Sequence, residues 1–118
     1  MDHLMYAIAR GSTPTLELEL PFELPVASVC YATFSQDDKP VLEYSVNGKP
    51  SSGIRGAGTL TIDPDDPSIL LLAMTQSDTL VLERGDADLQ VRVRTYNGAD
   101  TFLPLHGEIV QAQKEGVI

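Results

Sequence analysis

The sequence predicts an all-β protein, a sandwich or small barrel of about seven or eight short antiparallel strands. Two observations carry this prediction. Apolar and polar residues alternate with a period of two through most of the chain, as in "LELEL" at residues 16–20, which is typical of strands with one buried face. Turn-forming residues also recur about every ten positions, an interval that suits short strands.

The first half of the chain supplies three expected strands and a loop. In the first strand Leu16, Leu18 and Leu20 share the buried face, while Glu17 and Glu19 face solvent. The other segments are a strand over 28–34, a strand over 41–46 that ends at the turn pair Asn47-Gly48, and a loop rich in glycine and serine over 49–58.

The second half supplies the remaining strands and one helical turn. Thr75 followed by Asp78 resembles a capping box, which predicts a short helical turn near residues 76–81. Pro104 interrupts the final strand, which indicates an edge position or a bulge. The other segments are strands over 59–62, 69–74, 89–93 and 101–110, with a second turn pair at Asn97-Gly98.

Length and charge limit the classes of function. At 118 residues with 42% hydrophobic composition, we predict a single domain over 1–118, with 1–9 as an N-terminal arm or edge strand and 111–118 as a flexible tail that frays or docks on a partner. The net charge of −9 argues against nucleic-acid binding. No signal peptide or membrane-spanning stretch is evident, so we expect a protein made in the cytosol and no membrane partner.

The best candidate for a metal site is "IDPDDPS" at residues 62–68. Asp63, Asp65 and Asp66 offer hard oxygen ligands at short spacing, as calcium prefers. The loop lacks the EF-hand glycine and its closing glutamate, and aspartate and proline form turns on their own account. We therefore predict no metal site and no cofactor, and keep these three aspartates as the candidate ligands.

Other chemistry-bearing residues have simpler explanations. "GIRGAGT" at 53–59 invites a phosphate-loop interpretation, but a strand rather than a helix is expected to follow it. Cys30, the only cysteine, is expected to be a buried small hydrophobe. His3 and His106 lack a nucleophile motif beside them, and Glu17, Glu19 and Glu23 are explained by alternation. We predict no catalytic residues and no enzyme activity.

Five stretches of the chain resemble a family of short proteins encoded in phages and prophages of Firmicutes. The first is "RGSTPTLELELP" (10–21), similar to the Arg-Gly-Ser/Thr-Thr-Pro-Thr opening of that family. The others, in family order, are "YATFSQ" (31–36), "MTQSDTLVL" (74–82), "LQVRVRTYNG" (89–98) and "KEGVI" (114–118). The stretch 47–66 is longer than the usual link between strands in that family. The resemblance implies an immunoglobulin-like β-sandwich in a tail- or virion-associated accessory protein, with no catalytic residues to transfer.

These observations lead to an expected function of assembly. The chain is expected to be a non-enzymatic phage or prophage structural protein of the tail or baseplate, binding other virion proteins or copies of itself. It would be made in the host cytoplasm and then enter the virion. Two alternatives stay open: a prophage-encoded regulatory or host-directed binding module, and a calcium-binding module that uses Asp63, Asp65 and Asp66.

Overall fold

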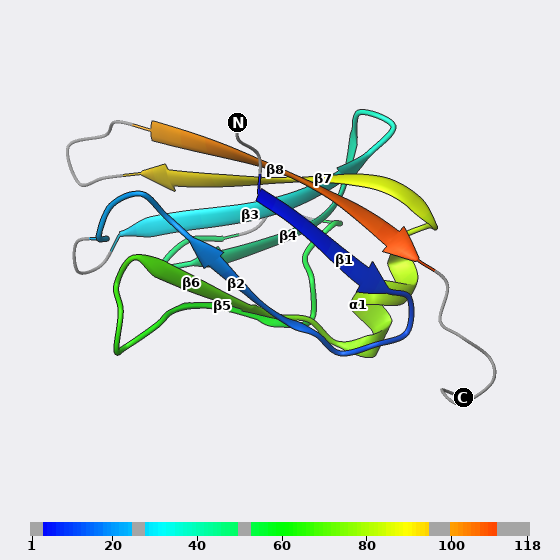
Figure 1. Ribbon diagram of the computed structural model, residues 1–118, viewed down its shortest axis with the longest axis horizontal. Helices are drawn as coiled ribbons and strands as arrows, with labels where there is room; N and C mark the ends of the chain where they lie inside the picture. Colours follow the sequence, from blue (N-terminus) through cyan, green and yellow to red (C-terminus); the bar gives the residue numbers. More distant parts are fainter. Residues whose placement is uncertain (1–3, 25–27, 50–52, 95–99, 111–118) are drawn as a thin grey trace.

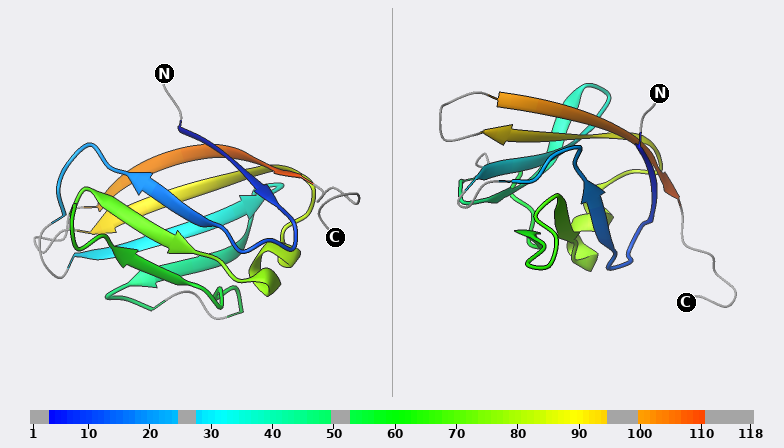
Figure 2. Two further views of the ribbon diagram at one scale, coloured as in Figure 1. Left: turned by 60° about the horizontal axis from the view of Figure 1, so that its bottom comes forward. Right: turned by 60° about the vertical axis from the view of Figure 1, so that its left-hand side comes forward.

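Two β-sheets pack face to face and enclose one hydrophobic core (Figures 1 and 2). The computed structural model describes residues 4–24, 28–49, 53–94 and 100–110, and of residues 4–6, 100–108 and 110 it describes the backbone. Within these residues there are eight strands and one short helix. They are β1 Leu4–Ala9, β2 Thr15–Glu19, β3 Val29–Gln36, β4 Lys39–Val46, β5 Thr59–Ile62, β6 Ile69–Ala73, α1 Gln76–Val81, β7 Gly85–Arg94 and β8 Asp100–Val110.

The larger sheet has five strands in the order β1-β8-β7-β3-β4, and the smaller has three in the order β2-β6-β5. Every pair of neighbouring strands is antiparallel except one: β1 runs parallel to β8, with Leu4 opposite Leu105 and Ala9 opposite Val110. The predicted antiparallel sandwich is confirmed, and the β1–β8 pair is its one parallel exception among the described strands. A parallel pair needs a long connection, and here almost the whole chain lies between the two strands, which no local pattern could reveal.

The core lies between the sheets and is built by the alternation that the sequence shows. In β3 and β7 the inward residues are fully buried while their neighbours are more exposed. β6, the central strand of the smaller sheet, buries Leu70 and Leu72 completely and leaves its other side chains half-buried. The buried hydrophobic residues are Ile8, Leu18, Leu20, Leu24, Cys30, Ala32, Phe34, Leu42, Tyr44, Leu60, Leu70, Leu72, Met74, Leu82, Ala87, Leu89, Val91, Val93 and Ile109.

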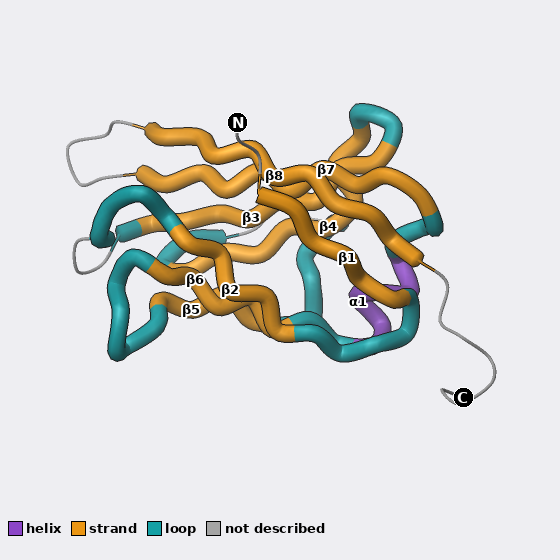
Figure 3. The backbone as a smooth tube through the Cα atoms, in the orientation of Figure 1, coloured by secondary structure: helices purple, strands orange, loops and turns teal. Residues whose placement is uncertain are grey.

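β3 and β4 form a hairpin that the sequence analysis did not predict. Gln36 pairs with Lys39, so Asp37 and Asp38 make a two-residue loop, and both have positive φ, 54° and 63°. Two-residue hairpin loops favour such backbones because they match the strand twist, and aspartate tolerates them. The turn pair that was predicted, Asn47-Gly48, does bend the chain, with Asn47 at φ 61°, but it leads β4 toward the other sheet and not into a hairpin (Figure 3).

β8 is continuous through Pro104, which pairs in register with Gln90 of β7. The expected interruption is therefore wrong. The expected edge position holds locally, because Pro104 has a paired strand on one side only among those described. The pairing of β8 with β1 starts only at Leu105, so Pro104 lies where β7 is the sole neighbouring strand described. The predicted turn at Asn97-Gly98 and the predicted tail at 111–118 lie outside the described residues. Within the described part of the chain, no helix is long and apolar enough to cross a membrane.

Candidate functional site

Three stretches that are far apart in the sequence meet around α1, at one end of the sandwich (Figure 1). The first is residues 10–14, which follow β1. The second is Gln36 at the end of β3, and the third is residues 74–83, which include α1. A helix of six residues has too few internal hydrogen bonds to be stable alone. α1 is held by tertiary contacts at both ends, and we call this region the α1 corner.

The beginning of α1 is capped as the sequence predicts. Thr75 is the N-cap, its side-chain hydroxyl accepts a hydrogen bond from the Asp78 N–H at 3.2 Å, and the Asp78 carboxylate accepts one from the Thr75 N–H at 3.4 Å. This reciprocal pair is a capping box. It satisfies two backbone donors at the helix start, which is why the chain leaves the β conformation at this point.

Asp78 also binds two elements outside the helix. Its carboxylate accepts hydrogen bonds from the Tyr44 hydroxyl at 2.8 Å and from the N–H groups of Ala57 at 2.8 Å and Gly58 at 2.9 Å. The side chain of Asp78 is 3% exposed, so it ties α1 to β4 and to the start of β5 from inside the fold.

The protonation states of Asp78 and Tyr44 follow from the same contacts. Burial by itself raises the pKa of Asp78, but the hydrogen bonds from Ala57, Tyr44, Gly58 and Thr75 outweigh it and lower the pKa below its ordinary value. Burial, followed by the hydrogen bond to the carboxylate, raises the pKa of Tyr44. The carboxylate is thus charged and the phenol neutral, an arrangement suited to anchoring backbone rather than to proton transfer.

The end of α1 is held by the "RGS" stretch that follows β1. Arg10 donates from Nε to the carbonyl of Leu82 at 2.7 Å and from Nη2 to the carbonyl of Leu80 at 3.0 Å. These carbonyls belong to the last turn, where helical partners run out and a cation is favourable. The guanidinium therefore acts as the C-terminal cap of the helix.

The buried hydroxyl of Thr79 joins the same stretch to the middle of α1. It accepts a hydrogen bond from the Gly11 N–H at 3.0 Å and donates to the Ser12 carbonyl at 2.8 Å. Farther along, the Met74 N–H donates to the Pro14 carbonyl at 2.9 Å. Residues 10–14 and 74–82 thus form one bonded unit, although the sequence separates them by about half the chain.

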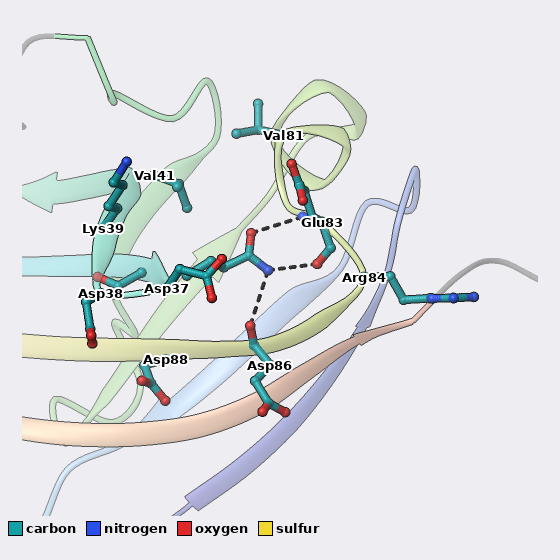
Figure 4. Close-up of a pocket in the computed structure, with 11 residues that line it drawn as sticks. Asp37, Asp38, Lys39, Val41, Val81, Glu83, Arg84, Asp86 and Asp88 are labelled. Carbon is teal, nitrogen blue, oxygen red and sulfur yellow. Dashed lines mark hydrogen bonds between the residues drawn. The ribbon is translucent and has the colours of Figure 1, made fainter.

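Gln36, the last residue of β3, fixes the segment that leaves α1. Its amide nitrogen donates to the carbonyls of Glu83 at 2.7 Å and Asp86 at 3.3 Å, and its amide oxygen accepts from the Glu83 N–H at 3.0 Å (Figure 4). A glutamine amide can make these bonds together because it carries both donors and an acceptor. Gln36 thereby connects the β3–β4 hairpin to the α1–β7 connection.

The α1 corner presents two large aliphatic side chains to solvent. Leu80 is 48% and Val81 is 51% exposed, and they are the exposed large hydrophobic residues among those described. Val81 borders a hollow of about 450 Å³ between the β3–β4 hairpin and the α1–β7 connection. The lining is mostly charged, with more acidic than basic side chains (Figure 4): Ser35, Gln36, Asp37, Asp38, Lys39, Val41, Val81, Glu83, Arg84, Asp86 and Asp88.

A second, smaller hollow of about 270 Å³ lies on β3, β4 and β7. The guanidinium carbon of Arg92 lies 4.4 Å from the centre of the Tyr31 ring, a cation–π contact. The Nε atom of Arg92 is buried without a hydrogen-bond partner among the described residues. Because that atom is covered, it cannot receive a ligand from the hollow.

The three candidate metal ligands do not converge. Asp63 accepts a hydrogen bond from the Asp65 N–H at 2.9 Å, and Asp66 accepts from the N–H and hydroxyl of Ser68 at 3.0 and 2.7 Å. The hydroxyl bond and then the N–H bond from Ser68 lower the pKa of Asp66. These are aspartate turns between β5 and β6, and among the described residues no group of three histidine, cysteine, aspartate or glutamate side chains is placed to hold a metal ion.

The glycine-rich stretch is packed against the sheets instead of forming a phosphate loop. A Cβ added at Gly58 would collide with the Ala73 carbonyl oxygen, and one at Gly56 would collide with the Tyr44 ring. The next element is β5, a strand, as the sequence indicates. The N–H of Gly58 donates to the Asp78 carboxylate. The absence of side chains at these glycines thus lets the backbone pass close to its neighbours.

The other candidates lie apart from the α1 corner or outside the described part of the chain. Cys30 is fully buried, and burial raises the pKa of its thiol to about 11, so it is not a reactive thiolate. Glu17, Glu19 and Glu23 are exposed. His106 belongs to β8 by its backbone, and its side chain is outside the described residues, as is the whole of His3.

Sequence reasoning missed the α1 corner as a site. The signals present were the two consecutive aspartates of the β3–β4 loop and the adjacent Leu80 and Val81 at the end of an amphipathic turn. Neither signal is specific alone. Only the fold brings the hairpin tip and the helix end to the two sides of one hollow.

Comparisons with known proteins bear on the fold. No protein-family model matches the chain, and no curated protein matches it. Among solved structures it is similar to the second Ig domain of the mouse polymeric immunoglobulin receptor, with 14% identity over 97% of this chain and 100% of that one and a TM-score of 0.54. The chain has an immunoglobulin-like β-sandwich fold.

Two other solved structures are similar to this chain in fold. The NK cell receptor Nkp44, described as a triggering partner in natural cytotoxicity, matches with 11% identity over 92% of this chain and 99% of that one, with a TM-score of 0.55. CopC from Methylosinus trichosporium OB3b matches with 15% identity over 95% and 87%, with a TM-score of 0.53. At these identities the likeness concerns the fold alone.

Proposed function

We propose that this immunoglobulin-like protein is a non-enzymatic binding module that acts by protein–protein assembly, in the tail or baseplate of a phage. The observation that carries the proposal is the α1 corner. There, the side chains of Arg10, Gln36 and Asp78 hold a six-residue helix and its following segment in place by hydrogen bonds. The helix exposes Leu80 and Val81. A rigid element that presents aliphatic side chains is suited to recognition by another protein.

The phage setting rests on the resemblance of short motifs to the phage family. "RGSTPT", the Gln that closes "YATFSQ" and "MTQSDTLVL" are three of the five stretches similar to the phage family. All three meet at the α1 corner.

The experiment is mass spectrometry of particles purified after prophage induction. We expect the chain to copurify with tail proteins through a density gradient, at a constant ratio to them. An abundant host cytosolic protein, followed through the same gradient, controls for trapped material. Absence of the chain from particles, while it is abundant in the lysate, would reject the virion role and leave the regulatory or host-directed binding module.

A further inference from the structure

We propose that the α1 corner is the docking site for a segment of a partner protein in which basic side chains flank an aliphatic one. This inference rests on the proposed function, because it names the chemistry of the partner in assembly. It concerns the exposed pair Leu80 and Val81 together with the hollow that Val81 borders.

The apolar half of the site is a short strip along the end of α1. Leu80 lies beside Gly11, where an added Cβ would be 3.7 Å from the Leu80 Cδ2 atom. Val81 follows, and across the hollow lies the half-buried Val41 of β4. Covering an exposed aliphatic side chain is favourable because it removes apolar surface from water. An aliphatic side chain of the partner would pack against Leu80 and Val81.

The charged half of the site is the lining of the hollow. Asp37 and Asp38 come from the hairpin tip, and Glu83 and Asp86 from the connection that leaves α1. The basic lining residues are Lys39 and Arg84, and Arg84 extends away from the hollow (Figure 4). The local charge is therefore negative, like the net charge of −9 for the whole chain. Charge complementarity selects a basic partner and disfavours an acidic one.

The walls of the hollow are held before any partner arrives. Gln36 bonds the carbonyls of Glu83 and Asp86 across its floor, and Arg10 holds the carbonyls of Leu80 and Leu82. Binding to a preorganised surface loses less conformational entropy than ordering a loop would. The hydrogen bonds thus explain how so short a helix can serve as a recognition element.

The test uses the whole protein and a defined probe. The probe is the peptide acetyl-Lys-Leu-Lys-Ile-Lys-amide, titrated at low salt and followed by backbone amide chemical shifts. We expect saturable shifts at residues 36–41 and 80–86, and weaker binding at physiological salt because exposed charges are screened. Two control peptides replace either the lysines with glutamates or the aliphatic residues with serines, and both should bind at least tenfold more weakly.

Matched variants separate a defined site from general charge attraction. Asp37→Asn with Asp38→Asn removes two charges while keeping residues that tolerate positive φ, and should raise the Kd about fivefold. Leu80→Gln with Val81→Thr should raise it about tenfold. Glu23→Gln with Asp65→Asn, at two exposed positions outside the lining of the hollow, removes the same charge and should leave the Kd within about twofold.

Each result decides between outcomes. Absence of saturable shifts, shifts outside the α1 corner, or an equal loss of affinity in the Glu23 and Asp65 variant would overturn the docking site. If the chain is in particles but the peptide does not bind, the proposed assembly role stands and this inference fails. If the peptide binds and the chain is absent from particles, the docking site stands and the virion setting fails. If the Leu80 and Val81 variant has a lowered Tm, the Kd of the Asp37 and Asp38 variant still tests the docking site.

Discussion

Asp78 is a buried charge whose hydrogen-bond partners among the described residues are all neutral donors. Its carboxylate accepts hydrogen bonds from the hydroxyl of Tyr44 and from three backbone N–H groups. Neutral donors directed at a carboxylate replace its lost hydration and keep it ionised. The residue therefore stabilises the fold through three elements at once, the start of α1, the strand β4 and the backbone that enters β5.

We expect Asp78→Asn to lower the free energy of unfolding by about 3 kcal/mol at neutral pH, since the amide turns one acceptor into a donor that faces N–H groups. Tyr44→Phe removes a single bond to the carboxylate and should lower it by about 1.5–2 kcal/mol. Urea denaturation of both variants tests these values, and the larger change should also reduce the Tm by about 10 °C. Equal stability of Asp78→Asn and the wild type would show that the carboxylate is not needed.

The pH dependence of stability has a definite sign. Although burial opposes it, hydrogen bonding lowers the pKa of Asp78 in the folded state below its ordinary value of 3.8. The unfolded chain therefore takes up the proton first as the pH falls. The difference in stability between wild type and Asp78→Asn should be constant above about pH 5 and should shrink below about pH 4. A difference that stays constant to pH 3 would contradict an ionised Asp78.

Two elements, α1 and the segment that enters β5, are stabilised more by tertiary contacts than by the intrinsic conformational propensities of their residues. α1 is short, and its caps come from Thr75 at one end and Arg10 at the other. The stretch before β5 depends on glycines, because the backbone of Gly58 passes directly against Ala73 of β6. Both elements were located from sequence, but the reasons for their positions lie in residues far away along the chain.

The glycines of this stretch allow a matched pair of substitutions. Gly58→Ala should destabilise by more than about 4 kcal/mol or prevent folding, because its Cβ would meet a backbone oxygen that cannot move freely. Gly53→Ala meets no atom within 4 Å, and its cost of about 1 kcal/mol arises only from the φ of +91°. Thermal melts of the two variants check this. Similar melting temperatures would mean that the β5–β6 packing is looser than the structure shows.

For the molecule as a whole, the exposed edges of the two sheets have to be kept from pairing with other chains. β2 is an edge strand of the smaller sheet, with β6 as its neighbour. Its exposed positions include Glu17 and Glu19, while Leu18 is buried. Two copies that approached edge to edge would bring like charges together, which is unfavourable by about 0.2–1 kcal/mol for each opposing pair. The acidic half of the alternation thus protects the edge.

Replacing both glutamates with threonine, which favours strands and carries no charge, should promote self-association. Sedimentation velocity over a concentration series should show dimers or larger species for Glu17→Thr with Glu19→Thr, and fewer for the wild type. Glu17→Lys with Glu19→Lys provides the control, because it restores like-charge repulsion with the opposite sign. If the threonine variant remains as monomeric as the lysine variant, the edge is protected by something other than charge.

Local patterns in the chain were enough to predict the class of fold, most strands and the helical turn at 76–81. This is because alternation and capping act between residues two to four positions apart. They also excluded a reactive Cys30, since a lone cysteine in an apolar strand is expected to be buried. The loop at Asp37 and Asp38 agrees with turn chemistry, because aspartate tolerates positive φ, but two consecutive aspartates are a weaker turn signal than the Asn-Gly pairs at 47–48 and 97–98.

Only the tertiary structure decided what lies beside what. The parallel pairing of β1 with β8, the route of β4 to β5, the bonds of Asp78 and the α1 corner all join residues that are far apart in sequence. Such contacts depend on how two sheets close over a shared core, and no local pattern encodes that closure. For the same reason no local pattern shows that the stretch "RGS" at residues 10–12 holds a helix about seventy residues later.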